Sequence, residues 1–292
     1  MDTPKTLPFH VWDVFTDTPF TGNPLAIVDL TDGGVTLATR QMQTLARQFN
    51  LSETIFLMPP RDPAHTVRAR IFFPTAEIPF AGHPTVGAAL FLSARGTSGD
   101  IVIEEEAGNV PVTVAQGRAQ FTAPVLPAAH GRTLDPPLCA RACGLGTEDI
   151  GPHAPGSFAA GPAFAYIPVA DRDALRRARP VQPHWDELMA AAGVDSGFLY
   201  DPDLNARMFS PTAGIPEDPA TGSACAILAA QLLANTALDD GVTTLSVRQG
   251  EDMGRPSAIA LEVEVADGRL AAVRVAGGAV WVMSGEVRIP AP

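Results

Sequence analysis

Two segments of the chain are apolar on every side. Residues 84–94 read PTVGAALFLSA and residues 221–235 read TGSACAILAAQLLAN, and neither contains a charged residue. A helix that is apolar around its whole circumference is a buried helix. Elsewhere apolar and polar residues alternate between glycine turns, as in residues 243–250 and 257–289, which predicts antiparallel strands and hairpins. Strands wrapped around a central helix are the simplest architecture that satisfies both patterns.

One stretch of sequence occurs twice. Residues 70–90 and 207–227 align at a constant offset of 137 residues, and each copy leads into one of the apolar segments. A repeat this long indicates a duplicated domain rather than a solenoid. The identical pairs are Arg70/Arg207, Phe72/Phe209, Pro74/Pro211, Thr75/Thr212, Ala76/Ala213, Ile78/Ile215 and Pro79/Pro216.

Matching elements also precede both copies. Residues 37–50 and 184–194 place apolar residues at helical spacing, and each is followed by a short apolar strand pattern that ends in proline, at 51–59 and 194–202. We therefore predict an α+β fold of two pseudo-symmetric halves, each an antiparallel, barrel-like sheet wrapped round a central buried helix.

The boundary between the halves is predicted near residues 124–127. The region that follows is rich in proline and glycine and has room for one short helix. The first half is assigned residues 1–125, with a strand near 280–290 as a candidate to complete it, and the second half residues 126–292. We expect the active site in the cleft between them.

Composition narrows the classes of function. The chain has 292 residues, 46% hydrophobic content and a net charge of −12, which argues against a nucleic-acid partner. No run of about 18 apolar residues predicts a membrane span. Three cysteines and no secretory signal pattern fit a reducing cytoplasm. The sequence shows no phosphate-binding loop and no cluster of metal ligands, so we predict neither metal nor cofactor.

The start of each apolar helix is a candidate anion site. A helix N-terminus presents unpaired N–H groups and the positive end of the helix dipole. Gly82 and Thr85 stand at the first helix, and Thr221, Gly222 and Ser223 at the second. Together they predict a small anionic metabolite as ligand.

The two copies diverge where reactive side chains stand. Asp218 falls opposite Ala81, His83 falls opposite Ala220, and Glu53 adds a carboxylate to an apolar strand. Two acids and a histidine around an anion site form a proton-transfer constellation. Purely structural alternatives remain open at this point: Glu53 as the capping partner of an earlier residue or as a solvated acid at a strand end, Asp218 as a helix N-cap, and His83 as a core histidine bonded to backbone.

Five ordered motifs resemble those of one family. FTGNPLAIV, NLSETIFL, FFPTAEIPFAGHPTVGAA, EDPATGSA and QGEDMGRPS are similar to motifs of the phenazine-biosynthesis isomerases, the PhzF-like proteins, from about Val11 to Ile289. That family is similar in fold to diaminopimelate epimerase and proline racemase. The resemblance implies two related halves with the active site between them.

The resemblance also implies roles for individual residues. It makes Glu53 the catalytic acid and base, with His83 and Asp218 as further catalytic residues of the site. Asn23 reads as a turn residue before a strand, and we include it in the predicted substrate-binding set with Gly82, Thr85, Thr221, Gly222 and Ser223. Cys225 lies too far into its helix to act as a racemase thiol, and neither helix start contains a cysteine.

We therefore expect a cofactor-independent isomerase that moves a proton within a small carboxylate-bearing metabolite. We also expect it to be a homodimer and to be cytoplasmic. Two alternatives stay open. The first is a cofactor-independent racemase or epimerase of an amino or hydroxy acid. The second is a metabolite-binding protein without catalysis.

Overall fold

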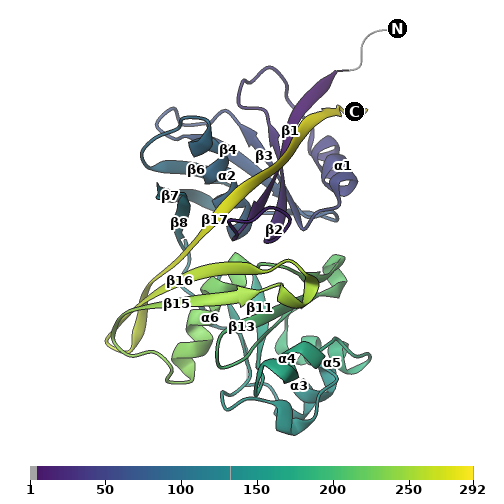
Figure 1. Cartoon of the computed structure of the whole chain (residues 1–292), viewed down its shortest axis with the longest axis vertical. Helices are drawn as coiled ribbons and strands as arrows, with labels where there is room; N and C mark the ends of the chain where they lie inside the picture. Colours follow the sequence, from purple (N-terminus) through teal and green to yellow (C-terminus); the bar gives the residue numbers. More distant parts are fainter. Residues whose placement is uncertain (1–4, 132, 292) are drawn as a thin grey trace. The chain divides into compact units, whose positions relative to one another are not determined.

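The computed structural model describes residues 5–131 and 133–291, which divide into two compact units (Figure 1). Unit 1 comprises Met1–Pro124 with Ala276–Pro292, and unit 2 comprises Val125–Val275. The last strand, β17 (Arg269–Arg288), runs through 20 residues and leaves unit 2 for unit 1 between Val275 and Ala276. The segment near 280–290, which the sequence offered as a candidate to complete the first half, lies in unit 1, and unit 2 ends at Val275.

Unit 1 is built from short strands and two helices. Its helices are α1 (Thr39–Phe49) and α2 (Gly82–Ala94). Its strands, besides the end of β17, are β1 (Thr6–Val14), β2 (Asn23–Asp29), β3 (Glu53–Met58), β4 (Val67–Phe72), β5 (Glu77–Ile78), β6 (Ile101–Glu105), β7 (Gly108–Ala115) and β8 (Arg118–Thr122).

Unit 2 contains more helix. Its helices are α3 (Pro136–Ala142), α4 (Arg172–Arg177), α5 (His184–Ala192) and α6 (Gly222–Ala234), with short 3-10 turns at Thr147–Asp149, Pro211–Ala213 and Glu251–Met253. Its strands, besides the start of β17, are β9 (Ala128–Ala129), β10 (Gly156–Ala159), β11 (Ala163–Pro168), β12 (Gly197–Tyr200), β13 (Asn205–Ser210), β14 (Ile215–Asp218), β15 (Gly241–Gln249) and β16 (Ser257–Ala266).

The same pairing order occurs within each unit. In unit 1, β1 pairs antiparallel with β2, β2 parallel with β3, β3 antiparallel with β4, and β4 parallel with β6. In unit 2, β10 pairs antiparallel with β11, β11 parallel with β12, β12 antiparallel with β13, and β13 parallel with β15. The α+β prediction is confirmed, and the sheets are mixed rather than purely antiparallel.

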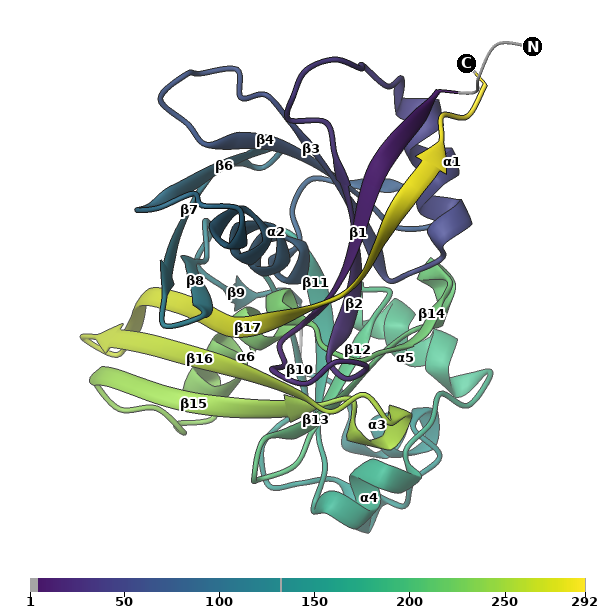
Figure 2. The ribbon, with the colours of Figure 1, turned by 45° about the horizontal axis from the view of Figure 1, so that its top comes forward.

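Each unit buries one helix as the sequence predicts. Every residue of α2 from Gly82 to Phe91 is buried, and α2 contacts β1, β2, β3, β7 and β8 (Figure 2). A methyl group on Gly87 would come within 2.5 Å of a Leu25 methyl carbon, so the glycine sets how closely α2 approaches the strands. In unit 2, α6 contacts β9, β10, β11 and β16, and ten of its thirteen residues are buried.

The other predicted helices are amphipathic and cover a sheet with one face. The buried face of α1 consists of Met42, Leu45 and Ala46, and the helix ends at Asn50 in the left-handed region. In unit 2, α5 buries Trp185 and Leu188. None of the helices that the structure describes is long and apolar enough to cross a membrane.

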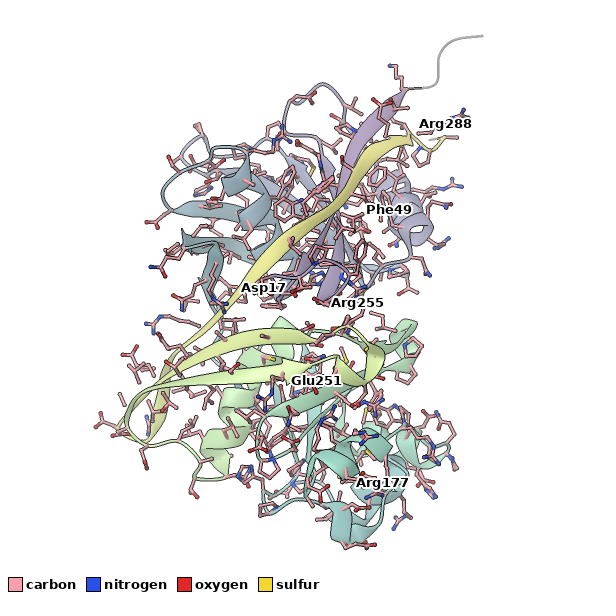
Figure 3. The ribbon with its side chains drawn as sticks, in the orientation of Figure 1. Asp17, Phe49, Arg177, Glu251, Arg255 and Arg288 are labelled. Carbon is pink, nitrogen blue, oxygen red and sulfur yellow. The ribbon has the colours of Figure 1, made fainter. Side chains whose placement is uncertain are left out.

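The arginines around α4 are engaged in surface ion pairs. Arg177, labelled in Figure 3, pairs with Asp149 and Asp173, and Arg172 pairs with Glu251 and Asp252. These contacts make this segment a solvated, ion-paired helix face.

An arginine and a phenylalanine shared by the two copies of the repeat have the same structural role in each unit. Arg70 on β4 lies over the ring of Phe72, at 5.3 Å from the ring centroid, and donates two hydrogen bonds to Glu77 on β5. Arg207 on β13 lies 4.8 Å from the centroid of Phe209 and makes the same bidentate contact. In unit 2 the partner is Glu217 on β14. The retained arginine and phenylalanine therefore fix the short strand that leads to the buried helix.

We predict that these equivalent arginines differ in their contribution to stability. Arg207 also donates to the carbonyl groups of Leu175, Arg176 and Ala178, and its side chain is half as exposed as that of Arg70. Lysine cannot reproduce a bidentate contact. Arg207→Lys should lower the free energy of unfolding by about 2–3 kcal/mol, because part-buried carbonyl and carboxylate acceptors lose their donors. Arg70→Lys should cost about 1 kcal/mol or less.

Urea denaturation of the two variants, with matched m-values, measures the difference. Equal losses for the two substitutions would show that the carbonyl contacts of Arg207 contribute nothing.

Candidate active site

Glu53 is held at the start of a buried strand. It is the first residue of β3 and stands opposite Leu25 in the parallel pairing with β2. The five residues that follow it in β3 are buried, whereas the Glu53 side chain is 12% exposed. Its backbone is thus fixed by the sheet while its side chain stays partly exposed.

His83 brings a second titratable group to Glu53. It is the second residue of α2, and its side chain is only 2% exposed. Its Nδ1 atom lies 2.8 Å from Glu53 Oε2, a distance at which a proton can pass between a carboxylate and an imidazole. In the part of the chain that the structure describes, neither Glu53 Oε2 nor His83 Nε2 forms an aligned hydrogen bond, although both are buried. The solvated-acid reading of Glu53 is therefore wrong.

The start of α2 has no side-chain cap. Its N-cap residue is Ala81, no acidic residue occupies the first turn, and Gly82 is the first helical residue. The partial positive charge at this N-terminus is thus balanced by no helix side chain of its own. Asn23, the first residue of β2, is fully buried and pairs with Val14 of β1.

Thr85 is less available than the sequence suggests. Its side chain is fully buried, and its hydroxyl oxygen lies 2.8 Å from the Ala81 carbonyl oxygen and 2.7 Å from Glu105 Oε1. A hydroxyl group with two protein partners favours a supporting role in unit 1, so its contact with substrate remains a prediction.

In unit 2 a network of hydrogen bonds orients Asp218. Thr221 donates its hydroxyl proton to Asp218 Oδ2 at 2.6 Å. Gln249 donates through Nε2 to the Asp218 carbonyl oxygen and to Thr221 Oγ1, and its Oε1 accepts from the Thr221 backbone N–H. Every hydrogen in this network has one acceptor. Asp218 and Gln249 are 4% and 1% exposed, so the carboxyl group is held in one orientation.

The start of α6 resembles the start of α2. Thr221 is its N-cap residue, but the Thr221 side chain makes no capping hydrogen bond because it serves Asp218. Gly222 is buried and Ser223 is half-buried. The capping reading of Asp218 is therefore not what the structure shows, and the first turn of α6 offers uncapped N–H groups as α2 does.

The cysteines have the wrong ionisation state for a thiolate mechanism. All three are buried and unpaired to any other cysteine. Burial raises the pKa of Cys225 far above its ordinary value, with a further rise from the charge of Asp218, and burial raises the pKa of Cys139 to about 12. Among the described residues, no three His, Cys, Asp or Glu side chains gather in a way that could hold a metal ion.

Sequence reasoning missed two residues at the helix starts. Gln249 lies in the QGEDMGRPS motif, but that motif was given no role. Glu105 lies in a run of three glutamates and contacts Thr85 only through the fold. The motif itself was a usable signal for Gln249, whereas no local pattern distinguishes Glu105.

We predict that Gly250 is required to hold this part of unit 2. Its φ is +79°, and a methyl group there would lie 2.4 Å from the Arg255 carbonyl oxygen and 2.7 Å from that of Pro219, next to Asp218. Gly254 has a φ of +70° with open space around it, so it is a matched control. Gly254→Ala should cost about 1–2 kcal/mol for the left-handed backbone. Gly250→Ala should cost a further 1–3 kcal/mol or so for the overlap.

Chemical denaturation of both variants provides the comparison. The idea fails if Gly250→Ala is no more destabilising than Gly254→Ala.

One protein family accounts for nearly the whole chain. The family described as "Phenazine biosynthesis-like protein" matches residues 12–285. An uncharacterised isomerase of Mesorhizobium japonicum is 38% identical, over 98% of this chain and 100% of that protein. A trans-2,3-dihydro-3-hydroxyanthranilate isomerase of Pseudomonas aeruginosa is 30% identical, over 92% of this chain and 95% of that protein.

Solved structures show the same fold. A PhzF-family phenazine biosynthesis protein of Bacillus anthracis superimposes with a TM-score of 0.85 at 26% identity, over 98% of this chain and 100% of that one. A hydroxyproline epimerase of Agrobacterium vitis gives a TM-score of 0.64 at 13% identity, over 100% and 95%, which is a likeness of fold alone. The predicted relation to isomerases and epimerase-like folds is confirmed: this chain belongs to the phenazine biosynthesis-like family and is an isomerase.

Proposed function

We propose that this isomerase moves a proton within a small carboxylate-bearing metabolite and needs no cofactor. The observation that carries the proposal is the Glu53–His83 pair at the uncapped start of α2. A carboxylate that is beside an imidazole, mostly buried and still partly reachable can take a proton from carbon and give it back.

Proton transfer in this scheme begins and ends on Glu53. Glu53 acts as the base in its carboxylate form, with His83 Nδ1 at 2.8 Å from its Oε2 atom. It takes a proton from a carbon atom of the substrate, and the electron pair of that C–H bond enters the adjacent unsaturated system. Glu53 then returns the proton to another carbon of the same system. The double bond has moved, no atom is gained or lost, and the enzyme is in its starting state.

Substrate binding is assigned to the uncapped N–H groups at the starts of α2 and α6 and to the polar side chains beside them. In unit 1 we assign His83 and the amides at Gly82 to substrate polar groups, with Asn23 as a further candidate. In unit 2 we assign the same work to Asp218, to Ser223 and to the first amides of α6. A carboxylate on the substrate suits these groups, because helix N-termini favour anions. We keep as predictions that one substrate is served by both sets, that the protein is a homodimer and that it is cytoplasmic.

The second candidate function is epimerisation by a carboxylate. Support for it comes from the protein described as a predicted epimerase of Pseudomonas aeruginosa, which is 32% identical with a TM-score of 0.81 over 96% of this chain and 99% of that one. Two-thiol racemisation is disfavoured, because Cys225 is fully buried and its raised pKa keeps it protonated.

The two candidate functions give different products in D₂O. The first substrate to try is trans-2,3-dihydro-3-hydroxyanthranilate, the substrate named for the Pseudomonas aeruginosa relative. An isomerase changes the double-bond pattern seen by ¹H NMR, whereas an epimerase inverts one centre and leaves deuterium there. The assays contain excess chelator, and turnover that appears only after a divalent metal is added would contradict cofactor independence.

We predict that Glu53→Gln loses turnover and keeps binding. Glutamine preserves size and one acceptor oxygen but cannot accept a proton from carbon. General acid–base catalysis contributes about 10²- to 10⁴-fold, so kcat should fall at least about a hundredfold while ligand affinity changes little. Asp218→Asn should raise KM as well as lower kcat, because its assigned contacts exist in both the ground and the transition state.

Glu106→Gln is the matched control, since Glu106 is exposed and also lies in unit 1. If Glu53→Gln keeps more than about a tenth of the wild-type rate, the loss is too small for a general base and Glu53 is not that base.

A further inference from the structure

Three adjacent glutamates in unit 1 have three different environments. The backbone N–H groups of Asp62 and Arg61, with help from His65, hold the pKa of Glu104 at about 2. Glu106 is exposed. Glu105, the last residue of β6, is 8% exposed, and its only side-chain partner in the described part of the chain is Thr85.

The geometry around Thr85 determines where the protons are. Thr85 Oγ1 lies 2.8 Å from the Ala81 carbonyl oxygen and 2.7 Å from Glu105 Oε1. A hydroxyl group has one proton to donate, and a carbonyl oxygen only accepts. Both short contacts are attractive when Glu105 is a neutral acid that donates to Thr85, while Thr85 donates to Ala81. If Glu105 were ionised, one of the two contacts would bring lone pairs together.

The second oxygen of Glu105 supports a neutral group. Glu105 Oε2 is buried and has no hydrogen-bond partner among the described residues. A buried oxygen without a partner is far less costly on a neutral acid than on a carboxylate. This observation is independent of the contact with Thr85.

Burial is the main influence on the protonation of Glu105. Burial raises the pKa of Glu105 to about 8, against a smaller lowering by the Thr85 hydrogen bond. β6 pairs with β7, which has no titratable side chain, and with β4, which has two arginines. Helix α2 reaches Glu105 through Thr85, and its one titratable side chain is His83. Glu105 shares a cavity of about 480 Å³ with Arg61, Arg68, Arg70, Glu77, Glu104 and Glu106.

We propose that Glu105 is a positioning residue: as a neutral acid it holds Thr85, which holds the Ala81 carbonyl and so fixes the turn that carries Gly82 and His83. The proposal rests on the proposed function, in which His83 and the Gly82 amide face the substrate. In this proposal Glu105 does not touch the substrate, and it positions Gly82 and His83 through the two hydrogen bonds of Thr85.

The first test is spectroscopic and needs no substrate. Protein labelled with ¹³C in the glutamate carboxyl groups should show, at pH 7, one signal of a protonated acid that disappears in Glu105→Gln. The ¹⁵N signals of the His83 ring report the position of the α2 start. They should be unchanged in Glu105→Gln, whose amide still donates to Thr85, and shifted in Glu105→Met, which has similar length and no donor.

The Thr85 variants supply an independent pair. Thr85→Val removes the hydroxyl group at nearly constant shape and should shift the His83 signals as Glu105→Met does, whereas Thr85→Ser should not. If Glu105→Met does not fold, the Thr85 pair decides the question. The proposal would be overturned if the Glu105 carboxyl group is ionised at pH 7. It would also be overturned if the ¹⁵N signals of the His83 ring are unchanged in both Glu105→Met and Thr85→Val.

Turnover separates this proposal from the proposed function. Misplacement of a catalytic group by about 1 Å costs up to about a hundredfold in rate, so Glu105→Met should lower kcat roughly 10- to 100-fold while Glu105→Gln stays within about threefold. If the wild-type chain turns nothing over, the proposed function fails, and the spectra still decide the role of Glu105. Equal rate losses in the Gln and Met variants would remove the hydrogen-bond role.

The pH dependence of stability has a definite sign. Glu105 ionises at about 8 when folded and at its ordinary value of 4.5 when unfolded. As pH rises between these values, the unfolded chain loses its proton first, so the folded protein loses stability. The Tm advantage of Glu105→Gln over the wild type should therefore grow from about pH 4.5 to about pH 8 and then level off. A difference that stays flat across this window contradicts a neutral buried acid.

Discussion

The burial of one uncharged helix in each unit is the constraint on which the rest of the structure depends. Neither α2 nor α6 has a charged residue, so each is stable only when strands surround it. A helix enclosed in this way can meet polar groups only at its ends. Its N-terminus still presents unpaired N–H groups and about half a positive charge. Polar side chains therefore contact each helix at its start. Glu53 and His83 lie together there in unit 1, and Asp218 and Thr221 in unit 2.

Duplication explains why the scaffold is repeated and the chemistry is not. The retained arginine and phenylalanine hold the short strand before each helix, a task that is the same in both units. The two copies differ at the positions where this strand ends and the helix begins. Unit 1 has His83 as the second residue of α2 and unit 2 has Asp218 as the last residue of β14, so one duplicated frame presents an imidazole in one copy and a carboxylate in the other.

Sequence patterns were sufficient for features that are local or repeated. The uncharged runs predicted α2 and α6, and the family motifs selected Glu53 and His83, which the fold brings to 2.8 Å. Contacts between segments that are distant in the sequence could not be predicted from these patterns. Glu105 stands in a run of three glutamates, and nothing local distinguishes it from its two neighbours; its burial and its contact with Thr85 come from the fold. The parallel pairings were missed for the same reason, since alternation shows that a strand is present but not which neighbour it takes.

The neutral state of Glu105 matters for the chemistry at the start of α2. Glu53 must carry a negative charge to act as a base, and a second carboxylate at the same helix start would oppose that charge. A protonated acid avoids the conflict and still has a hydrogen to donate. It can hold the Ala81 carbonyl through Thr85, which no carboxylate could do with one hydroxyl proton. The burial that makes α2 stable therefore also gives its supporting residue the protonation state that proton transfer at Glu53 requires.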